Sequence, residues 1–174
     1  MQEAKKQKKL SPELRRKIII LAAKICAVLL FLYIVFFRLY GLTRITTNVM
    51  SPRVSGGDLA IVFHAESNFT NGDVLIYEKD GNQYIGRVAA QQGDVIDVKE
   101  GKIYINGYLE DTSYYGDNIF PESSNISYPY TVAEKQIFIL GDNRNEVDDS
   151  RSFGAINYSE IRGRIIGILR TNAL

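Results

Sequence analysis

The hydrophobic pattern divides the chain into two unlike parts. The run over 18–37 is apolar except for Lys24, and about 20 such residues suffice to cross the hydrocarbon core of a bilayer. From Asp58 onward, apolar and polar residues alternate over short stretches, which is typical of β-strands. The sequence therefore predicts a single transmembrane helix over 18–38 and a mainly β domain over 39–174.

Six short runs in the second part have strand character: DLAIVFH, DVLIYEK, QYIGRVAA, DVIDVKEGKIYINGY, KQIFILGD and GRIIGILR. The turns between them contain Gly or Asn, which supply the positive φ of tight hairpins and so favour antiparallel pairing. The clearest predicted hairpin is VIDVKEGKIYING, whose two apolar arms face each other across a Glu-Gly turn. We expect an antiparallel β domain with no long helix after the membrane segment.

Charge sets the expected orientation of the membrane helix. The tail over 1–17 contains seven Lys or Arg residues and two Glu residues, so the positive-inside bias predicts a cytoplasmic N-terminus and an extracytoplasmic domain at the plasma membrane. Lys24 lies two turns into the helix and can extend toward the headgroups. A cleaved secretory signal is the competing interpretation, but the apolar run is long and FFRLYGLTR lacks a small-residue cleavage site.

Composition excludes several kinds of site. The only cysteine, Cys26, lies in the apolar run, so the domain has no internal disulfide. The only histidine is His64, which leaves no metal-ligand cluster and gives little support to Ser-His or Cys-His catalysis. We expect neither a metal nor another cofactor. The excess of acidic residues in the domain disfavours nucleic acid as a partner.

The Tyr-rich stretch over 108–132 is too long for an ordinary connection between strands. Its aromatic side chains could contact a partner, or they could cover the domain itself. The sequence leaves both interpretations open.

Three sequence blocks contain the candidate functional residues: NVMSPRVSGGD (48–58), QYIGRVAAQQGDVI (83–96) and FILGDNRNEVDDSRSFGAI (138–156). In order and spacing they resemble the conserved boxes of the type I signal peptidases, family S26. These are membrane-anchored serine endopeptidases of β fold that remove leader peptides from exported proteins. The resemblance covers nearly the whole chain, and GDNR followed by DSR is its most specific part.

The same resemblance shows three departures from the family pattern. It places Val49 at the nucleophilic serine, Gly86 at the general-base lysine, and Val147 at the serine that orients this lysine. A serine hydroxyl attacks an amide only when a neighbouring base takes its proton, and lysine serves only with a lowered pKa. We therefore assign no catalytic residue. Because one engineered change would explain Val49 alone, a naturally inactive relative is the better interpretation.

Two groups of residues remain as candidates. The resemblance implies that Thr47 stands at the oxyanion-donor position and that Met50 and Pro52 form an apolar platform facing the membrane. The degenerate site, as a candidate client-binding groove, comprises Thr47, Val49, Met50, Ser51, Pro52, Gly86 and Arg87. The third box is expected to form a charged network that maintains the fold, comprising Asp142, Asn143, Arg144, Val147, Asp149, Ser150 and Arg151.

A lost dyad on this architecture resembles the signal-peptidase-like accessory proteins of Gram-positive pilus gene clusters, of the SipA kind. The resemblance implies chaperone-like assistance to sortase-dependent pilus assembly, with a pilin subunit and the pilus sortase as partners. Two alternatives remain open. One is an active leader peptidase that uses a displaced nucleophile such as Ser51, and the other is a tethered β-domain with an unrelated contact. The sequence also leaves open a homodimer.

Overall fold

The described part of the first compact unit is a single helix. The computed structural model describes residues 11–110, 116–120 and 126–170, and its compact units divide between Arg38 and Leu39. Helix α1 (Pro12–Leu39) has no buried residue. The Ser11 hydroxyl accepts a hydrogen bond from the Leu14 amide and so caps its first turn. The helix is long and apolar enough to cross a membrane.

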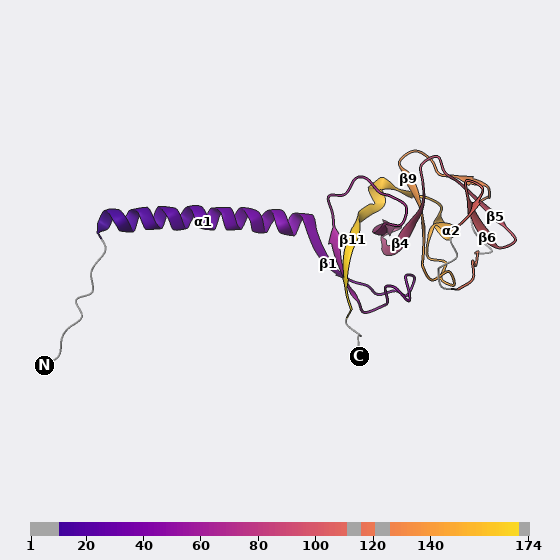
Figure 1. Cartoon of the computed structure of the whole chain (residues 1–174), viewed down its shortest axis with the longest axis horizontal. Coiled ribbons are helices and arrows are strands. Elements are labelled where there is room, and N and C mark those ends of the chain that lie inside the picture. Colours follow the sequence, from indigo (N-terminus) through magenta and orange to yellow (C-terminus); the bar gives the residue numbers. More distant parts are fainter. Residues whose placement is uncertain (1–10, 111–115, 121–125, 171–174) are drawn as a thin grey trace. The chain divides into compact units, whose positions relative to one another are not determined.

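The second unit contains two antiparallel sheets (Figure 1). The larger sheet has the order β1-β2-β11-β3-β4-β9-β10. Its strands are β1 (Tyr40–Arg44), β2 (Leu59–Phe63), β3 (Val74–Lys79), β4 (Asn82–Gln91), β9 (Gln136–Leu140), β10 (Ile156–Asn157) and β11 (Ile161–Leu169). The smaller sheet has the order β7-β6-β5-β8. Its strands are β5 (Val95–Lys99), β6 (Lys102–Ile105), β7 (Tyr108–Leu109) and β8 (Tyr130–Thr131).

The predicted antiparallel β fold is confirmed. Strands β5 and β6 form the expected hairpin, in which Ile96 lies opposite Ile105. Its turn uses Glu100 and Gly101, both at positive φ, as a two-residue hairpin turn requires. Among the described residues that follow α1, helical structure is limited to α2 (Ser150–Phe153) and a 3-10 turn.

Every second side chain of a strand faces the same side of the sheet, and the core forms on that side. One cluster of apolar residues joins β2, β3 and β4 to the loop after β1, and Met50 in this loop is 0% exposed. Two further clusters pack around β9, where Ile137 and Phe138 are fully buried. Complete burial of one such side chain contributes about 1.5–3 kcal/mol.

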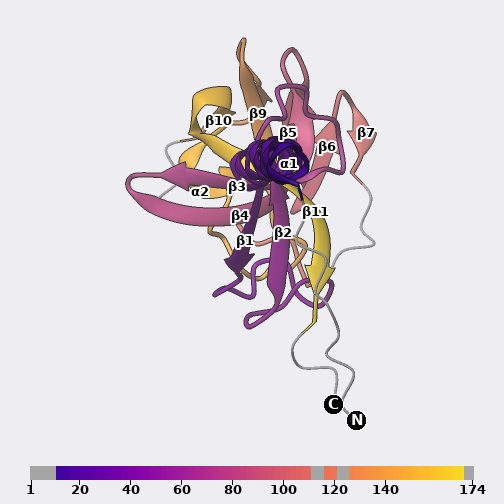
Figure 2. The ribbon, with the colours of Figure 1, turned by 90° about the vertical axis from the view of Figure 1, so that its left-hand side faces the viewer.

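The exposed apolar residues of the large sheet lie on its other face. Leu42 of β1 is 69% exposed and lies opposite Ile61 of β2, while Leu169 of β11 is 52% exposed and lies opposite Leu59. Figure 2 shows these three strands side by side. Exposed apolar residues are therefore present on β1 and β11, on either side of the half-buried face of β2.

Tyr77 on β3 should limit stability at alkaline pH. Its ring is fully buried and its hydroxyl donates to the Asp148 carbonyl at 3.4 Å. Burial first, and then the charge of Asp149, raise the pKa of Tyr77 well above its ordinary value. Because the folded pKa exceeds the unfolded value of about 10, this stability is complete below about pH 10 and declines as the pH rises further.

The predicted result is that Tyr77→Phe flattens the fall in the free energy of unfolding above about pH 10. Denaturant unfolding across this alkaline range measures it. Tyr108→Phe, at a ring that is 80% exposed, should keep the wild-type slope. Identical slopes for wild type and Tyr77→Phe would contradict the assignment.

Candidate functional site

The loop between β1 and β2 carries the first box and folds against the third. The Ile45 amide donates to the Asp58 carbonyl at 2.8 Å, which closes the loop at its base. Val49 is buried, and its carbonyl accepts a hydrogen bond from the Asn143 amide at 2.9 Å. The Asn143 side chain donates to the Asn48 carbonyl at 3.3 Å. Backbone contacts thus join the two boxes.

Val49 packs directly on Gly141. A Cβ atom at Gly141 would lie 2.7 Å from Val49 Cγ1 and 2.8 Å from the Val49 carbonyl oxygen. Contacts this short would force the backbone apart, so the approach requires glycine. The position that the family resemblance assigns to the nucleophile is therefore a buried hydrocarbon contact.

Gly86 on β4 is enclosed in the same way. A Cβ atom here would lie 2.4 Å from Ile139 Cγ2 and 3.3 Å from the Leu140 carbonyl oxygen. The Ile139 methyl group therefore takes the space that a side chain at position 86 would enter. Neither Val49 nor Gly86 can donate or accept a proton through a side chain.

Among the described residues, the hydrogen-bonding contacts of the Ser51 side chain are with neutral side chains. Its hydroxyl lies 3.4 Å from the Ser55 hydroxyl and 3.5 Å from the Asn48 side-chain oxygen. These groups do not have the basicity to activate a serine. Pro52 beside it is exposed. The geometry gives no support to Ser51 as a displaced nucleophile.

Met50 does not line an exposed surface. Its side chain packs in the core with Val54, Ala60 and Ile76, because the loop turns it inward between the sheet strands. The expectation that Met50 forms an exposed platform or groove wall is thus wrong. The exposed apolar side chains of the large sheet lie instead on β1 and β11, at Leu42, Ile166 and Leu169.

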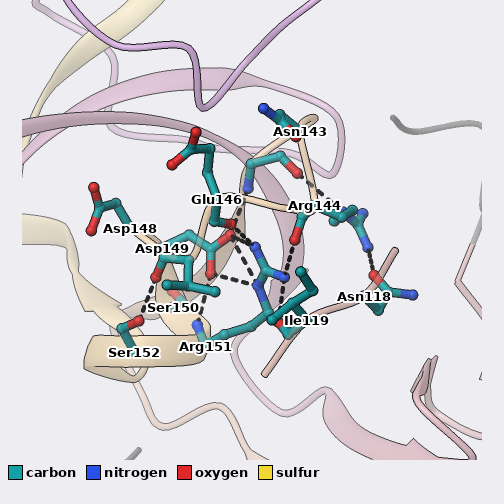
Figure 3. A network of polar contacts seen from close by, with 12 residues as sticks. Asn118, Ile119, Asn143, Arg144, Glu146, Asp148, Asp149, Ser150, Arg151 and Ser152 are labelled. Atoms are coloured by element: carbon teal, nitrogen blue, oxygen red, sulfur yellow. Dashed lines mark hydrogen bonds and ion pairs between the residues drawn. The ribbon is translucent and has the colours of Figure 1, made fainter. Parts of the chain in front are cut away.

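A buried ion pair organises the third box (Figure 3). The guanidinium of Arg151 contacts the Asp149 carboxylate at 2.8 Å, and both side chains are 0% exposed. Arg151 also donates to the carbonyls of Ile119 at 2.6 Å, Arg144 at 2.8 Å and Glu146. Two charges removed from water are tolerable only when further hydrogen bonds compensate their lost hydration.

The same pair fixes the end of β9. The Asp149 carboxylate accepts the Gly141 amide at 2.9 Å and the Arg151 amide at 2.9 Å, the second of which caps α2. The Ser150 hydroxyl accepts the Ile139 amide at 2.9 Å. The side-chain hydroxyl of Ser152 donates to the Val147 carbonyl. Val147 therefore takes part through its backbone, and its side chain orients no base.

Arg144 holds part of the Tyr-rich excursion on the domain. Its guanidinium binds the Glu110 carboxylate through two hydrogen bonds, at 2.7 and 2.9 Å, and the Asn118 side-chain oxygen at 2.7 Å. With the Ile119 contact to Arg151, the described part of the excursion packs against its own domain. Residues 111–115 and 121–125 lie outside the described residues.

Arg87 also has a structural partner. It binds the Asp142 carboxylate through two hydrogen bonds, at 2.8 and 2.7 Å, and donates to the Gly72 carbonyl at 2.7 Å. Asp142 is buried, and Arg53 lies 3.7 Å from it. This arrangement links β4 to the third box.

In the part of the chain that the structure describes, two strand edges beside this site lack a pairing strand. On β1, the Ile45 amide bonds to Asp58 and the Leu39 carbonyl accepts the His64 amide. Antiparallel ladders alternate, so the backbone groups of Leu42 and Arg44 point away from β2. β1 is the end strand of its sheet.

The first half of β4 has the second open edge. It pairs with β3 from Asn82 onward, whereas pairing with β9 begins only at Arg87. The Val88 amide bonds to the Asp73 carbonyl, so the same alternation directs the backbone groups of Gln83 and Ile85 toward the open side.

A groove lies between these two edges. Its inner part, about 20 Å³, is lined by Arg44, Ile45, Thr46, Thr47, Ile76, Gln83, Tyr84 and Ile85. Its other part, about 190 Å³, is lined by Gly41, Leu42, Thr43, Val62, His64, Ile76, Gln83 and Arg162. The two parts share Ile76 and Gln83, and together they are called the edge groove below.

Thr47, one of the residues that line the edge groove, carries an unsatisfied polar atom. Its hydroxyl oxygen is buried and has no hydrogen-bond partner among the described residues. Such a group costs about 1–3 kcal/mol when it stays unpaired. No group of three or more His, Cys, Asp or Glu that could hold a metal occurs in the described part of the chain.

Sequence reasoning identified Thr47 but missed the rest of the edge groove. Leu42, Gln83 and Ile85 belong to it through their backbone position in the sheet, which no side-chain motif reports. The register within each predicted hairpin could have indicated which residues face an open edge, had the strand order been known.

Gly86→Ala should destabilise the domain by about 1–3 kcal/mol, because the new methyl group overlaps Ile139 in a closed core. Denaturant unfolding measures the change. Gly167→Ala is the matched control, since a Cβ there meets Ile61 at ordinary distances of 3.5 Å and longer. Combining Gly86→Ala with Ile139→Ala should recover at least about 1 kcal/mol relative to additivity, and strict additivity would contradict the overlap.

Arg151→Met should cost about 3–5 kcal/mol, because it leaves the buried Asp149 carboxylate without its counter-charge. Arg162→Met provides the comparison, since Arg162 and Glu78 form an exposed pair at 2.9 Å worth at most about 1 kcal/mol. Thermal or denaturant unfolding of both variants tests this order. Similar small losses for the two would show that Arg151 does not hold the box.

Comparison with known proteins places this geometry in a family. The family described as signal peptidase, peptidase S26, matches residues 16–169. The chain is 28% identical over 152 residues to "Inactive signal peptidase IA" of Staphylococcus aureus (strain Mu50 / ATCC 700699), covering 83% of this chain and 87% of that protein. It is 28% identical over 103 residues to "Signal peptidase I S" of Bacillus subtilis (strain 168), covering 55% of this chain and 56% of that protein.

A solved signal peptidase I of Enterococcus faecalis V583 superposes with a TM-score of 0.48 at 23% identity, covering 58% of this chain and 99% of that one. The family match itself spans the helix and nearly all of the β domain. The chain therefore belongs to the signal peptidase family, peptidase S26.

Proposed function

We propose that this protein is a non-catalytic, membrane-anchored signal-peptidase-like protein that holds an extended client segment in the edge groove. One observation carries the proposal: among the described residues, two open strand edges flank a groove lined by residues of β1, the loop after it and β4. Val49 and Gly86 beside it supply neither nucleophile nor base. The name of the S. aureus relative, an inactive signal peptidase, supports the same interpretation.

An extended peptide suits this groove because it can pair with both edges. Main-chain hydrogen bonds then supply affinity and the shallow lining supplies selectivity. The lining residues on the β1 side run from Gly41 to Thr47, six residue steps of about 3.3 Å each. The groove therefore accommodates a client segment of about six or seven residues.

The cellular role follows from the resemblance to pilus accessory proteins. In this proposal the N-terminus is cytoplasmic, α1 crosses the plasma membrane, and the β domain faces outward. The client is a pilin subunit, which the protein holds for the pilus sortase in a chaperone-like way. Each copy has its own edge groove, so the proposal requires no homodimer.

The proposal predicts binding without cleavage. The full chain in neutral detergent is mixed with a leader-bearing peptide and with a folded pilin subunit, and both products and complexes are followed. The client should bind and remain uncut. Cleavage that disappears in Ser51→Ala would overturn the proposal in favour of an active peptidase with a displaced nucleophile.

Substitutions at Leu42 test whether the client pairs with the open edge of β1. Leu42→Pro removes an amide that faces the groove while leaving the bonds to β2, because proline is tolerated on the open side of an edge strand. It should weaken client binding roughly two- to ten-fold, the effect of one hydrogen bond. Leu42→Ala keeps the amide and removes the exposed side chain. Equal affinities for the two variants would contradict strand addition.

A further inference from the structure

The edge groove differs in charge from the domain around it. Residues 39–174 contain 12 Lys or Arg and 18 Asp or Glu, a net charge of 12 − 18 = −6. The residues that line the groove include Arg44, His64 and Arg162 but neither Asp nor Glu. An acidic domain thus carries a groove whose ionisable lining is basic apart from Tyr84.

Arg44 is the least neutralised of these groups. It is exposed and forms no ion pair among the described residues, whereas Arg87, Arg144, Arg151 and Arg164 each contact a carboxylate. The charge of Arg44 is therefore available to a ligand carboxylate.

The other end of the groove holds His64 and Arg162. The Nδ1 of His64 lies 2.7 Å from the Arg162 carbonyl, and because a carbonyl can only accept, Nδ1 carries the hydrogen. Arg162 shares its guanidinium with Glu78 at 2.9 Å, in a pair that is about half exposed (48% and 44%). Exposed pairs of this kind are weak and exchange partners readily.

We propose that the edge groove selects an acidic extended segment, with one carboxylate near Arg44 and a second near Arg162, beside His64. The proposal rests on the client-holding function above. His64 lies opposite Leu39 in the β1–β2 ladder, five residues from Arg44, so the two basic ends are about 17 Å apart. The acidic positions of the client are therefore about five residues apart.

A peptide fits these observations better than an isolated anion. A phosphate could neutralise Arg44, but it would leave the backbone groups of Leu42, Gln83 and Ile85 without strand partners. An extended peptide can place carboxylates near the basic groups and can also pair its backbone with the two open edges. Binding of an anionic lipid in place of the peptide is therefore one outcome that the test distinguishes.

The test uses the full chain in neutral detergent and three labelled octapeptides of uncharged residues that differ at the second and seventh positions. These positions carry Asp, Asn or Lys. Fluorescence anisotropy should rank the affinities Asp, then Asn, then Lys, with Asp roughly five-fold tighter than Asn, as expected for two exposed ion pairs. Added salt should reduce this preference.

Arg44→Glu should abolish or invert the preference for the Asp peptide. Lys102→Glu is the matched control, because it makes the same change of charge on β6, outside the groove lining. It should keep at least half of the wild-type preference. Equal effects of the two variants would overturn selection by the groove and indicate long-range attraction alone.

The outcomes separate this inference from the proposed function. If the Asn peptide binds and the Asp peptide gains nothing, acidic selection is overturned while client holding stands. If no peptide binds and the pilin also fails to bind, both are overturned. If anionic vesicles displace the Asp peptide through Arg44 while neutral vesicles do not, a lipid headgroup is the preferred ligand and the peptide proposal fails.

Discussion

The rest of the domain depends on the buried ion pair between Asp149 and Arg151. Both side chains are fully enclosed, so each oxygen and N–H group needs a partner at fixed distance. Those partners are backbone groups of the third box and of the excursion, including Gly141 and Ile119. The pair therefore fixes the end of β9, and through it the wall against which Val49 and Gly86 pack.

This dependence explains how the fold can persist without a catalytic dyad. Within the described residues, none of the hydrogen bonds given above for Arg151 and Ser152 uses the side chains of Val49, Gly86 or Val147. The first two positions instead form apolar contacts, with Gly141 and Ile139 respectively. A valine and a glycine there replace a proton-transfer pair by ordinary packing, while the ion pair continues to hold the surrounding loops.

The sequence predicted the strands and hairpins because side-chain alternation is local, and Ile96 faces Ile105 as expected. It also located the third box, whose acidic and basic side chains compensate each other's charge. It failed at Met50, whose direction depends on how the loop after β1 closes onto Asp58. The edge groove was equally inaccessible, because β11 enters between β2 and β3 from the far end of the chain, and only this order leaves β1 and β4 with open edges.

Open edges are themselves informative, because they invite unwanted pairing with other chains and folded proteins normally shield them. The path from β1 through β2, β11 and β3 to β4 contains only antiparallel steps, so β1 and β4 run in the same direction on either side of the groove. One extended segment could therefore pair with both strands in the same relative orientation. A client strand would shield both edges at once, which connects peptide binding to a feature of the fold that does not depend on cleavage.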